Sequence, residues 1–175
     1  MSLITANPFW AIVKGLGNNL IFTLLSCIIP FVCGAFFLYA IKKEQTKLLS
    51  WGAVLFESLC PVVLLTYMCY SSNVPTFFAV VIAFSICFVG YIPARAQESY
   101  SQLKNLLYYG LGLFRNVFLW SFCVSIIGGI DLLKATMMVA NTRYEFGILL
   151  LPLAVSFAIL AVVSIARKAI KDSMK

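Results

Sequence analysis

Five long apolar stretches alternate with short polar segments along this chain. They cover approximately residues 19–41, 48–70, 76–92, 116–130 and 147–166. A helix of about 20 apolar residues spans the roughly 30 Å hydrocarbon core of a bilayer, and inside lipid only helices and closed barrels satisfy every backbone polar group. The pattern therefore predicts an all-α integral membrane protein with about five transmembrane helices.

The composition supports a membrane protein independently of the boundaries of the stretches. Hydrophobic residues make up 62% and charged residues 11% of the chain, against about 45–50% and 25% in soluble domains. We expect one transmembrane domain, residues 19–166, between an N-terminal interfacial segment, residues 1–18, and a basic cytoplasmic tail, residues 167–175. Residues 1–18 lack the basic start and apolar run of a cleavable signal peptide.

The basic residues fall mostly on one side of the predicted spans. Cytoplasmic loops carry the excess of Lys and Arg, so this bias sets the orientation. With the N-terminus outside and the C-terminus in the cytoplasm, the outer side holds Lys14, Lys134 and Arg143. The cytoplasmic side then holds Lys42, Lys43, Lys47, Arg95, Lys104, Arg115, Arg167, Lys168, Lys171 and Lys175.

Several classes of chemistry lack the residues they need. Histidine is absent from the chain, which removes the commonest metal ligand and general base. The six cysteines lie in or beside the spans without a CxxC pair and are interpreted as apolar packing residues. No phosphate-binding G-x-x-x-x-G-K-[ST] pattern occurs, and the net charge of +7 forms no nucleic-acid-binding patch. We therefore predict neither an enzyme nor a nucleic-acid-binding protein.

Polar residues inside the predicted spans are the candidates for a transport route. Glu57 lies near the middle of the second span, where an ionised side chain is costly and usually faces the bundle interior or a partner. It is either such a pathway residue or a protonated glutamate packed against hydroxyls. Pro61 permits a helix kink one turn later, and Thr66 and Asn116 are further candidate pathway or gating residues.

A short amphipathic helix is predicted in the cytoplasmic loop before the fourth span. Leu103, Leu106, Leu107 and Gly110 recur at i, i+3, i+4 and i+7, and Gly110 can end the helix in a left-handed cap. Such a helix either rests on lipid headgroups or docks into a groove of a cytosolic protein.

Four segments resemble the permeases of binding-protein-dependent ABC importers. Residues 102–114 (QLKNLLYYGLGLF) are similar to their cytoplasmic coupling loop, Q-x-E-A-A-x-x-x-G-L-[SG]-x-[WF]. Residues 14–20 (KGLGNNL) and 61–65 (PVVLL) resemble the K-G-x-x-x-T-L and R-G-T-P-L-L segments of the polar amino-acid branch. Residues 125–133 (SIIGGIDLL) resemble its S-V-I-G-V-x-E-L-L segment most specifically.

This resemblance implies an ABC importer permease-like core in a bacterial cytoplasmic (inner) membrane. It implies partner ATPase subunits that bind ATP and Mg, and a second permease subunit that forms either a homodimer or a heterodimer with this chain. It also implies an extracytoplasmic solute-binding protein that delivers amino acids or related small polar solutes. The segment from Asp131 to Glu145 is the expected surface for that protein. The residues implied in coupling to the ATPase are Gln102, Leu103, Lys104, Leu106, Leu107, Gly110 and Leu111.

The chain also departs from the family pattern. Lys104, Asn105 and Leu106 replace the E-A-A signature, and the interval between Gly110 and Ser125 is shorter than in the family. A degenerate, non-transporting scaffold or assembly subunit is therefore the alternative. A small channel-like oligomer is less favoured, because no span shows a clear polar stripe.

Overall fold

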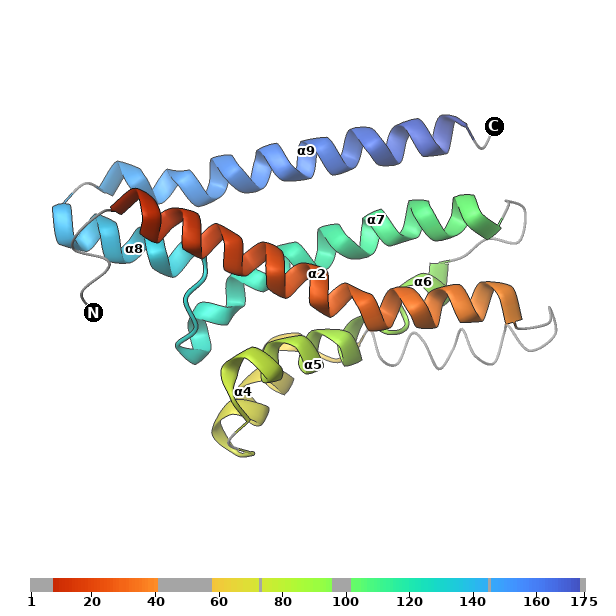
Figure 1. The fold of residues 1–175 in the computed structure, drawn as a ribbon, viewed down its shortest axis with the longest axis horizontal. Coiled ribbons are helices and arrows are strands. Elements are labelled where there is room, and N and C mark those ends of the chain that lie inside the picture. The colour runs from red at the N-terminus through yellow and green to blue at the C-terminus, as the bar shows by residue number, and fades with distance from the viewer. Residues whose placement is uncertain (1–7, 41–57, 73, 96–101, 145, 174–175) are drawn as a thin grey trace.

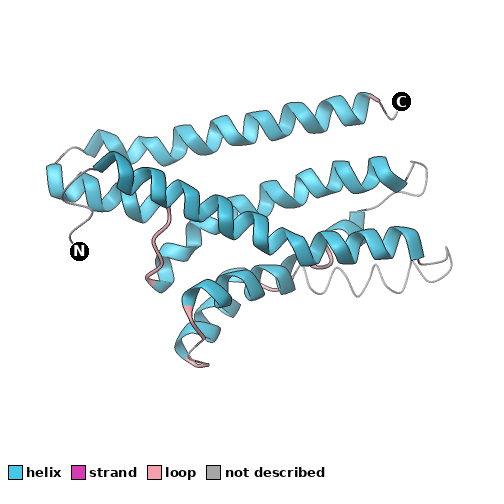
Figure 2. Ribbon diagram, in the orientation of Figure 1, coloured by secondary structure: helices cyan, strands magenta, loops and turns pink. Residues whose placement is uncertain are grey.

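A computed structural model describes residues 8–40, 58–72, 74–95, 102–144 and 146–173. All regular elements in these ranges are helices, joined by short loops (Figure 2). Four helical stretches in them are long and apolar enough to cross a membrane, which confirms the all-α membrane fold class. These stretches are Pro8–Tyr39, Thr76–Arg95, Leu103–Ile127 and Phe146–Asp172.

The longest helix, α2 (Pro8–Ala40), runs through the middle of the bundle (Figure 1). It packs against α5 (Thr76–Phe88), α7 (Gln102–Ser121) and α8 (Leu132–Arg143). Its 33 residues correspond to a length of about 50 Å. The helix is longer than the predicted span, so residues 8–18, expected as an interfacial segment, form its first turns.

Helix α4 (Pro61–Tyr70) is the described part of the predicted second span. Cys60 has an extended backbone, and Pro61 is the first residue of the helix. The expectation that Pro61 kinks a continuous helix was therefore wrong, because its ring is accommodated where no backbone donor is needed. Glu57 lies outside the described residues.

Helix α7 differs most from the prediction. It is one continuous helix from Gln102 to Ser121 and leads directly into the 3₁₀ helix η2 (Phe122–Ile127). Gly110 does not end a helix; it lies within α7, where an added Cβ would be 2.7 Å from Cε2 of Phe31 on α2. Arg115, expected in a loop, also lies within α7. The amphipathic pattern continues into an apolar run without a helix breaker, so the two predicted elements are one.

The short helix α6 (Tyr91–Arg95) follows α5, while η3 (Phe146–Leu150) and α9 (Leu151–Asp172) form the last span. Helix α8 lies against the start of α2 (Figure 1). A Cβ on Gly15 would be 2.8 Å from both the Ala135 Cβ and the Asp131 carbonyl oxygen. Glycine at this position therefore lets the two helices approach closely.

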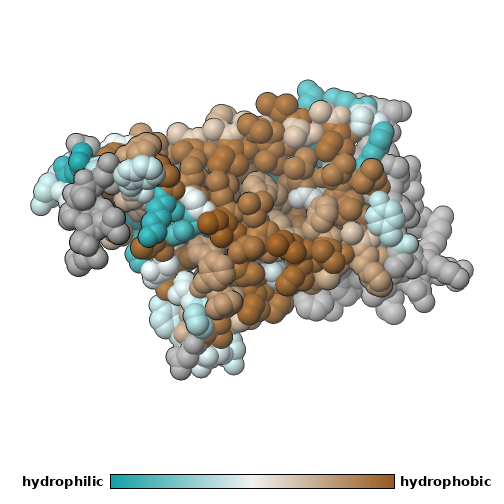
Figure 3. All heavy atoms as spheres, viewed as in Figure 1, coloured by the Kyte–Doolittle hydropathy of each residue, from teal (hydrophilic) through white to brown (hydrophobic). Residues whose placement is uncertain are grey.

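The two ends of the bundle differ in charge. We call the end with the start of α2 and α8 the α8 end, and the end with Arg95, Lys104, Arg167, Lys168 and Lys171 the basic end. Figure 3 shows apolar side chains over the middle of one face, with polar side chains gathered toward its two ends. Internally, side chains of α2, α4, α5, α6 and α7 form the core, and Leu65, Phe84, Ile92, Leu113 and Val117 are fully buried.

Candidate functional site

Asn19 joins three helices at the α8 end. Its side chain is fully buried. The Asn19 Nδ2 donates to Oγ of Ser121 at 2.8 Å, and its Oδ1 accepts from the backbone N–H of Leu132 at 2.8 Å. Ser121 Oγ in turn donates to the Phe118 carbonyl at 2.7 Å. Because a buried polar group without a partner is costly, this arrangement fixes α2, α7 and α8 relative to one another.

Asp131 completes this junction. One carboxylate oxygen accepts from the Lys134 N–H at 2.7 Å and caps α8, while the other accepts from the Ser125 N–H at 3.0 Å. Gly128, between them, has a φ of 85° and ends η2, and its carbonyl accepts from Lys134 Nζ at 2.8 Å. Residues 125–133, the segment most similar to the importer permeases, therefore form a compact capped turn.

The Asp131 side chain is fully buried. Burial raises the pKa of the Asp131 carboxyl above its ordinary value, and the hydrogen bonds from Lys134 and Ser125 oppose that rise. Asn18 adds a further hydrogen bond between α2 and this turn: its Nδ2 donates to the Ile130 carbonyl at 2.7 Å. The junction is thus a network of satisfied hydrogen bonds.

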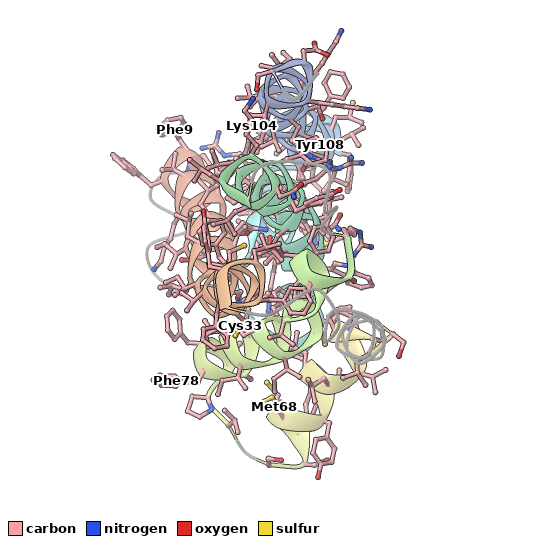
Figure 4. All side chains as sticks on the ribbon, turned by 90° about the vertical axis from the view of Figure 1, so that its right-hand side faces the viewer. Phe9, Cys33, Met68, Phe78, Lys104 and Tyr108 are labelled. Atoms are coloured by element: carbon pink, nitrogen blue, oxygen red, sulfur yellow. The ribbon has the colours of Figure 1, made fainter. Side chains whose placement is uncertain are left out.

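The basic end is held by contacts between α7 and α9. Lys104 Nζ donates to the Ser173 carbonyl, and the Arg167 guanidinium lies 4.4 Å from the centre of the Tyr108 ring. Figure 4 places Lys104 and Tyr108 where α7 meets α9. A second cation–π contact puts Arg95 4.2 Å from the Tyr91 ring centre. Cations here are therefore fixed against aromatic rings.

An apolar groove of about 370 Å³ lies between α2 and α7. Its lining residues come from both helices and carry almost no polar surface. They are Leu24, Cys27, Ile28, Phe31 and Val32 of α2, and Leu107, Gly110, Leu111, Leu113 and Phe114 of α7. The groove lacks the few polar groups that orient a small polar ligand.

The residues expected to contact an ATPase occupy the first half of α7. Gln102 is its first residue. Leu103 is 58% exposed and Leu106 is buried. Leu107, Gly110 and Leu111 line the groove against α2. The predicted set is therefore divided: Leu103 and Leu107 are exposed, whereas Leu106 is buried and Gly110 and Leu111 are half-buried.

The predicted pathway residues are not joined in the described chain. Thr66 Oγ1 donates to the Val62 and Val63 carbonyls of its own helix, at 3.0 and 2.9 Å. Pro61 is buried at the start of α4, and Asn116 is half-buried in α7. Among the described residues, no hydrogen bond links Thr66 to Asn116.

Asn19 and Ser121 were not among the predicted site residues. The available signal was the Asn18-Asn19 pair, two amides beside an otherwise apolar run. Polar residues at membrane depth usually face the bundle interior, and the reasoning applied to Glu57 would have selected them.

Comparison with known proteins identifies the fold. No family model matches the chain, and no curated protein does. A chain in a solved structure described as the crystal structure of an amino acid ABC transporter with histidines superposes with a TM-score of 0.75. The two are 19% identical, and the match covers 93% of this chain and 94% of that chain. The chain therefore has the fold of a chain of an amino acid ABC transporter, which confirms the resemblance found in its sequence at the level of the fold.

Proposed function

We propose that this chain is a transmembrane subunit of an ABC importer for amino acids or related small polar solutes. The observation that carries the proposal is the match over 93% of the chain to a chain of an amino acid ABC transporter. The capped turn around Asp131 supports it, because that turn is built by the segment most similar to the importer permeases.

The proposed partners follow from this function. ATPase subunits would bind ATP and Mg on the cytoplasmic side, a second permease subunit would complete the route, and a solute-binding protein would meet the α8 end. The basic end would face the cytoplasm, since Arg95, Lys104, Arg167, Lys168 and Lys171 outnumber Lys14, Lys134 and Arg143 at the other end.

Because α7 is one continuous helix, fewer of the proposed coupling residues can contact an ATPase. The proposed residues are Gln102, Leu103, Lys104, Leu106, Leu107, Gly110 and Leu111. Leu103, 58% exposed, and Leu107, 45% exposed, would be the residues that contact an ATPase, while Gly110 and Leu111 would act by packing α7 on α2. Closure of the ATPase dimer would then push on the end of a transmembrane helix and favour one of two bundle packings.

Purification of the tagged chain from its native membranes tests the proposal. We expect an ATPase and a second membrane subunit to accompany it, and the reconstituted complex to hydrolyse ATP faster when a solute is supplied. Recovery of the chain without any ATPase would reject the function.

Cysteine labelling tests the coupling contact. In a chain whose native cysteines are replaced, Leu103→Cys should be protected when the ATPase is present. Tyr144→Cys, 82% exposed at the α8 end, is the matched control and should label equally in both cases. Equal labelling at position 103 would place the coupling contact elsewhere.

The alternative is a non-transporting scaffold or assembly subunit, favoured by the replacement of the E-A-A signature. It predicts an ATPase-containing complex whose hydrolysis does not respond to solute through this chain. Glu57→Gln offers a second measurement, because unchanged assembly and uptake would remove Glu57 from the mechanism.

A further inference from the structure

Arg115 and Arg167 lie near each other where α7 meets α9. Arg115 is exposed on α7, and Arg167 is half-buried on α9. Cζ of Arg167 would be 3.4 Å from a Cβ on Gly112, which precedes Arg115 by one helical turn. Positions three apart on a helix have Cβ atoms about 5–6 Å apart, so Cζ of Arg167 lies within roughly 9 Å of the Arg115 Cβ. A single phosphate group is therefore within reach of both guanidinium groups, which bind phosphate through paired N–H donors.

This pair of arginines lies at the membrane surface of the basic end. The apolar residues 147–166 before Arg167 correspond to about 30 Å of helix, which is the thickness of the hydrocarbon core. Arg167 follows this stretch directly, and Lys168 and Lys171 of α9 come after it. Arg115 lies one turn deeper than Gly112, and its long side chain can extend toward the headgroups. A phosphate between the two arginines would therefore be that of a lipid headgroup.

The apolar groove between α2 and α7 adjoins this pair. Leu111 and Phe114 line the groove, and Leu111 lies one turn before Arg115 on the same face of α7. On α2, the lining residues run from Leu24 to Val32, a distance of about 12 Å along the helix. A groove with almost no polar surface suits a hydrocarbon chain better than a polar solute.

The charge of the chain favours an anionic ligand at this end. The sequence contains 13 basic and 6 acidic residues. Lys14, Lys134 and Arg143 belong to the α8 end, so ten basic residues remain. Pairing with every acidic residue of the chain, including those outside the described residues, would still leave four of these ten without an acidic partner. Anions from outside the chain must therefore balance part of this charge.

We propose that Arg115, Arg167 and the groove together bind one anionic phospholipid. The two guanidinium groups hold its phosphate, and the groove between α2 and α7 holds one of its acyl chains. Basic pockets between transmembrane helices are known to bind anionic headgroups on the cytoplasmic side. The binding does not depend on the proposed importer function, because it requires only that the leaflet at the basic end contains anionic lipid.

Native mass spectrometry of the full tagged chain, purified in its complex from native membranes, tests this binding. Phosphatidylglycerol or phosphatidylcholine with the same acyl chains is added to the delipidated protein, and the bound fraction is measured against lipid concentration. Arg115→Gln and Arg167→Gln are compared with Arg143→Gln, which removes an exposed arginine at the end of α8.

A second pair of variants tests the groove. Ile28 and Ile29 of α2 are 54% and 51% exposed, but only Ile28 lines the groove. Ile28→Trp therefore fills the groove, and Ile29→Trp is the matched control.

We expect phosphatidylglycerol to bind more tightly than phosphatidylcholine. Arg115→Gln and Arg167→Gln should each weaken phosphatidylglycerol binding about fivefold, the usual effect of one cation near an anionic membrane surface. Arg143→Gln should leave it unchanged. Ile28→Trp should weaken phosphatidylglycerol binding, and Ile29→Trp should not.

Several results would overturn the proposal. Equal affinity for the two lipids would exclude recognition of the anionic headgroup, and equal binding by Ile28→Trp and Ile29→Trp would exclude the groove. Displacement of phosphatidylglycerol by an equal concentration of inorganic phosphate would assign the arginines to a soluble anion. If Arg115→Gln weakened binding only in a chain that also carries Glu57→Gln, Arg115 would instead pair within the chain. Lipid bound to the isolated chain but not to the complex would assign the groove to another subunit.

Discussion

Replacement of Asn19 by alanine should loosen the junction of α2, α7 and α8. The change removes the donor to Ser121 and the acceptor for the Leu132 N–H, both at 2.8 Å. Ser121 keeps its bond to the Phe118 carbonyl. The Leu132 N–H, in contrast, is left at a buried position without its acceptor.

The expected loss follows from that difference. Leaving a buried donor unsatisfied costs about 1–3 kcal/mol, whereas interhelical hydrogen bonds in membrane proteins average about 0.6 kcal/mol because the unfolded state finds other partners. Asn19 is fully buried among three helices, so little water can replace it. We therefore expect Asn19→Ala to lower the free energy of unfolding by about 1–3 kcal/mol.

Reversible unfolding in mixed detergent micelles, followed by circular dichroism, measures this loss. Asn141→Ala, at an exposed position of α8, is the control and should change stability by less than about 0.5 kcal/mol. A double-mutant cycle with Ser121→Ala should show that the two residues are coupled. Equal stability of Asn19→Ala and Asn141→Ala, or strictly additive effects with Ser121→Ala, would refute the junction.

Further predictions concern packing, pH and the hydroxyl in α4. Gly15→Ala should lower the free energy of unfolding by about 1–3 kcal/mol through overpacking, because the added Cβ would lie 2.8 Å from atoms of Asp131 and Ala135. Gly17→Ala is the control and should be neutral or slightly stabilising in the same assay, because its Cβ would have nothing within 4 Å. Burial raises the pKa of Asp131, so the folded state binds its proton more tightly than the unfolded state does. The free energy of unfolding should therefore fall as pH rises above 3.8 through the raised pKa. Asp131→Asn should remove this pH dependence when unfolding is measured across pH. Thr66→Val should leave stability and solute uptake nearly unchanged, because Thr66 bonds only carbonyls of its own helix; a large loss of uptake would return this residue to the transport route.

Much of the fold was predictable because hydrophobic length is a strong signal in lipid. The stretches around residues 19–41, 76–92 and 147–166 each overlap a described helix. An amphipathic helix that ends at Gly110 and a separate span at residues 116–130 were predicted where the structure has the continuous helix α7. The error arose because Gly110 was interpreted as a helix end. A glycine inside a membrane helix can instead accommodate a neighbouring ring, here that of Phe31, and only the packing distinguishes the two cases.

The candidate site was less predictable. The segment around Asp131 was identified from its similarity to a family segment, but its role as a helix cap tied to Ser125 depends on a three-dimensional turn. Arg115 was counted among the cytoplasmic basic residues, directly before the fourth span predicted at residues 116–130. The structure places this residue inside α7, so local polarity gave the wrong boundary.

The continuity of α7 has a mechanical consequence. Its first turn lies beside Lys104, and its last residue, Ser121, is bonded to Asn19. Under the proposed importer function, a displacement at the basic end would therefore be carried toward the α8 end along one unbroken helix. The hydrogen bonds of Asn19 would then pass that displacement from α7 to α2 and α8.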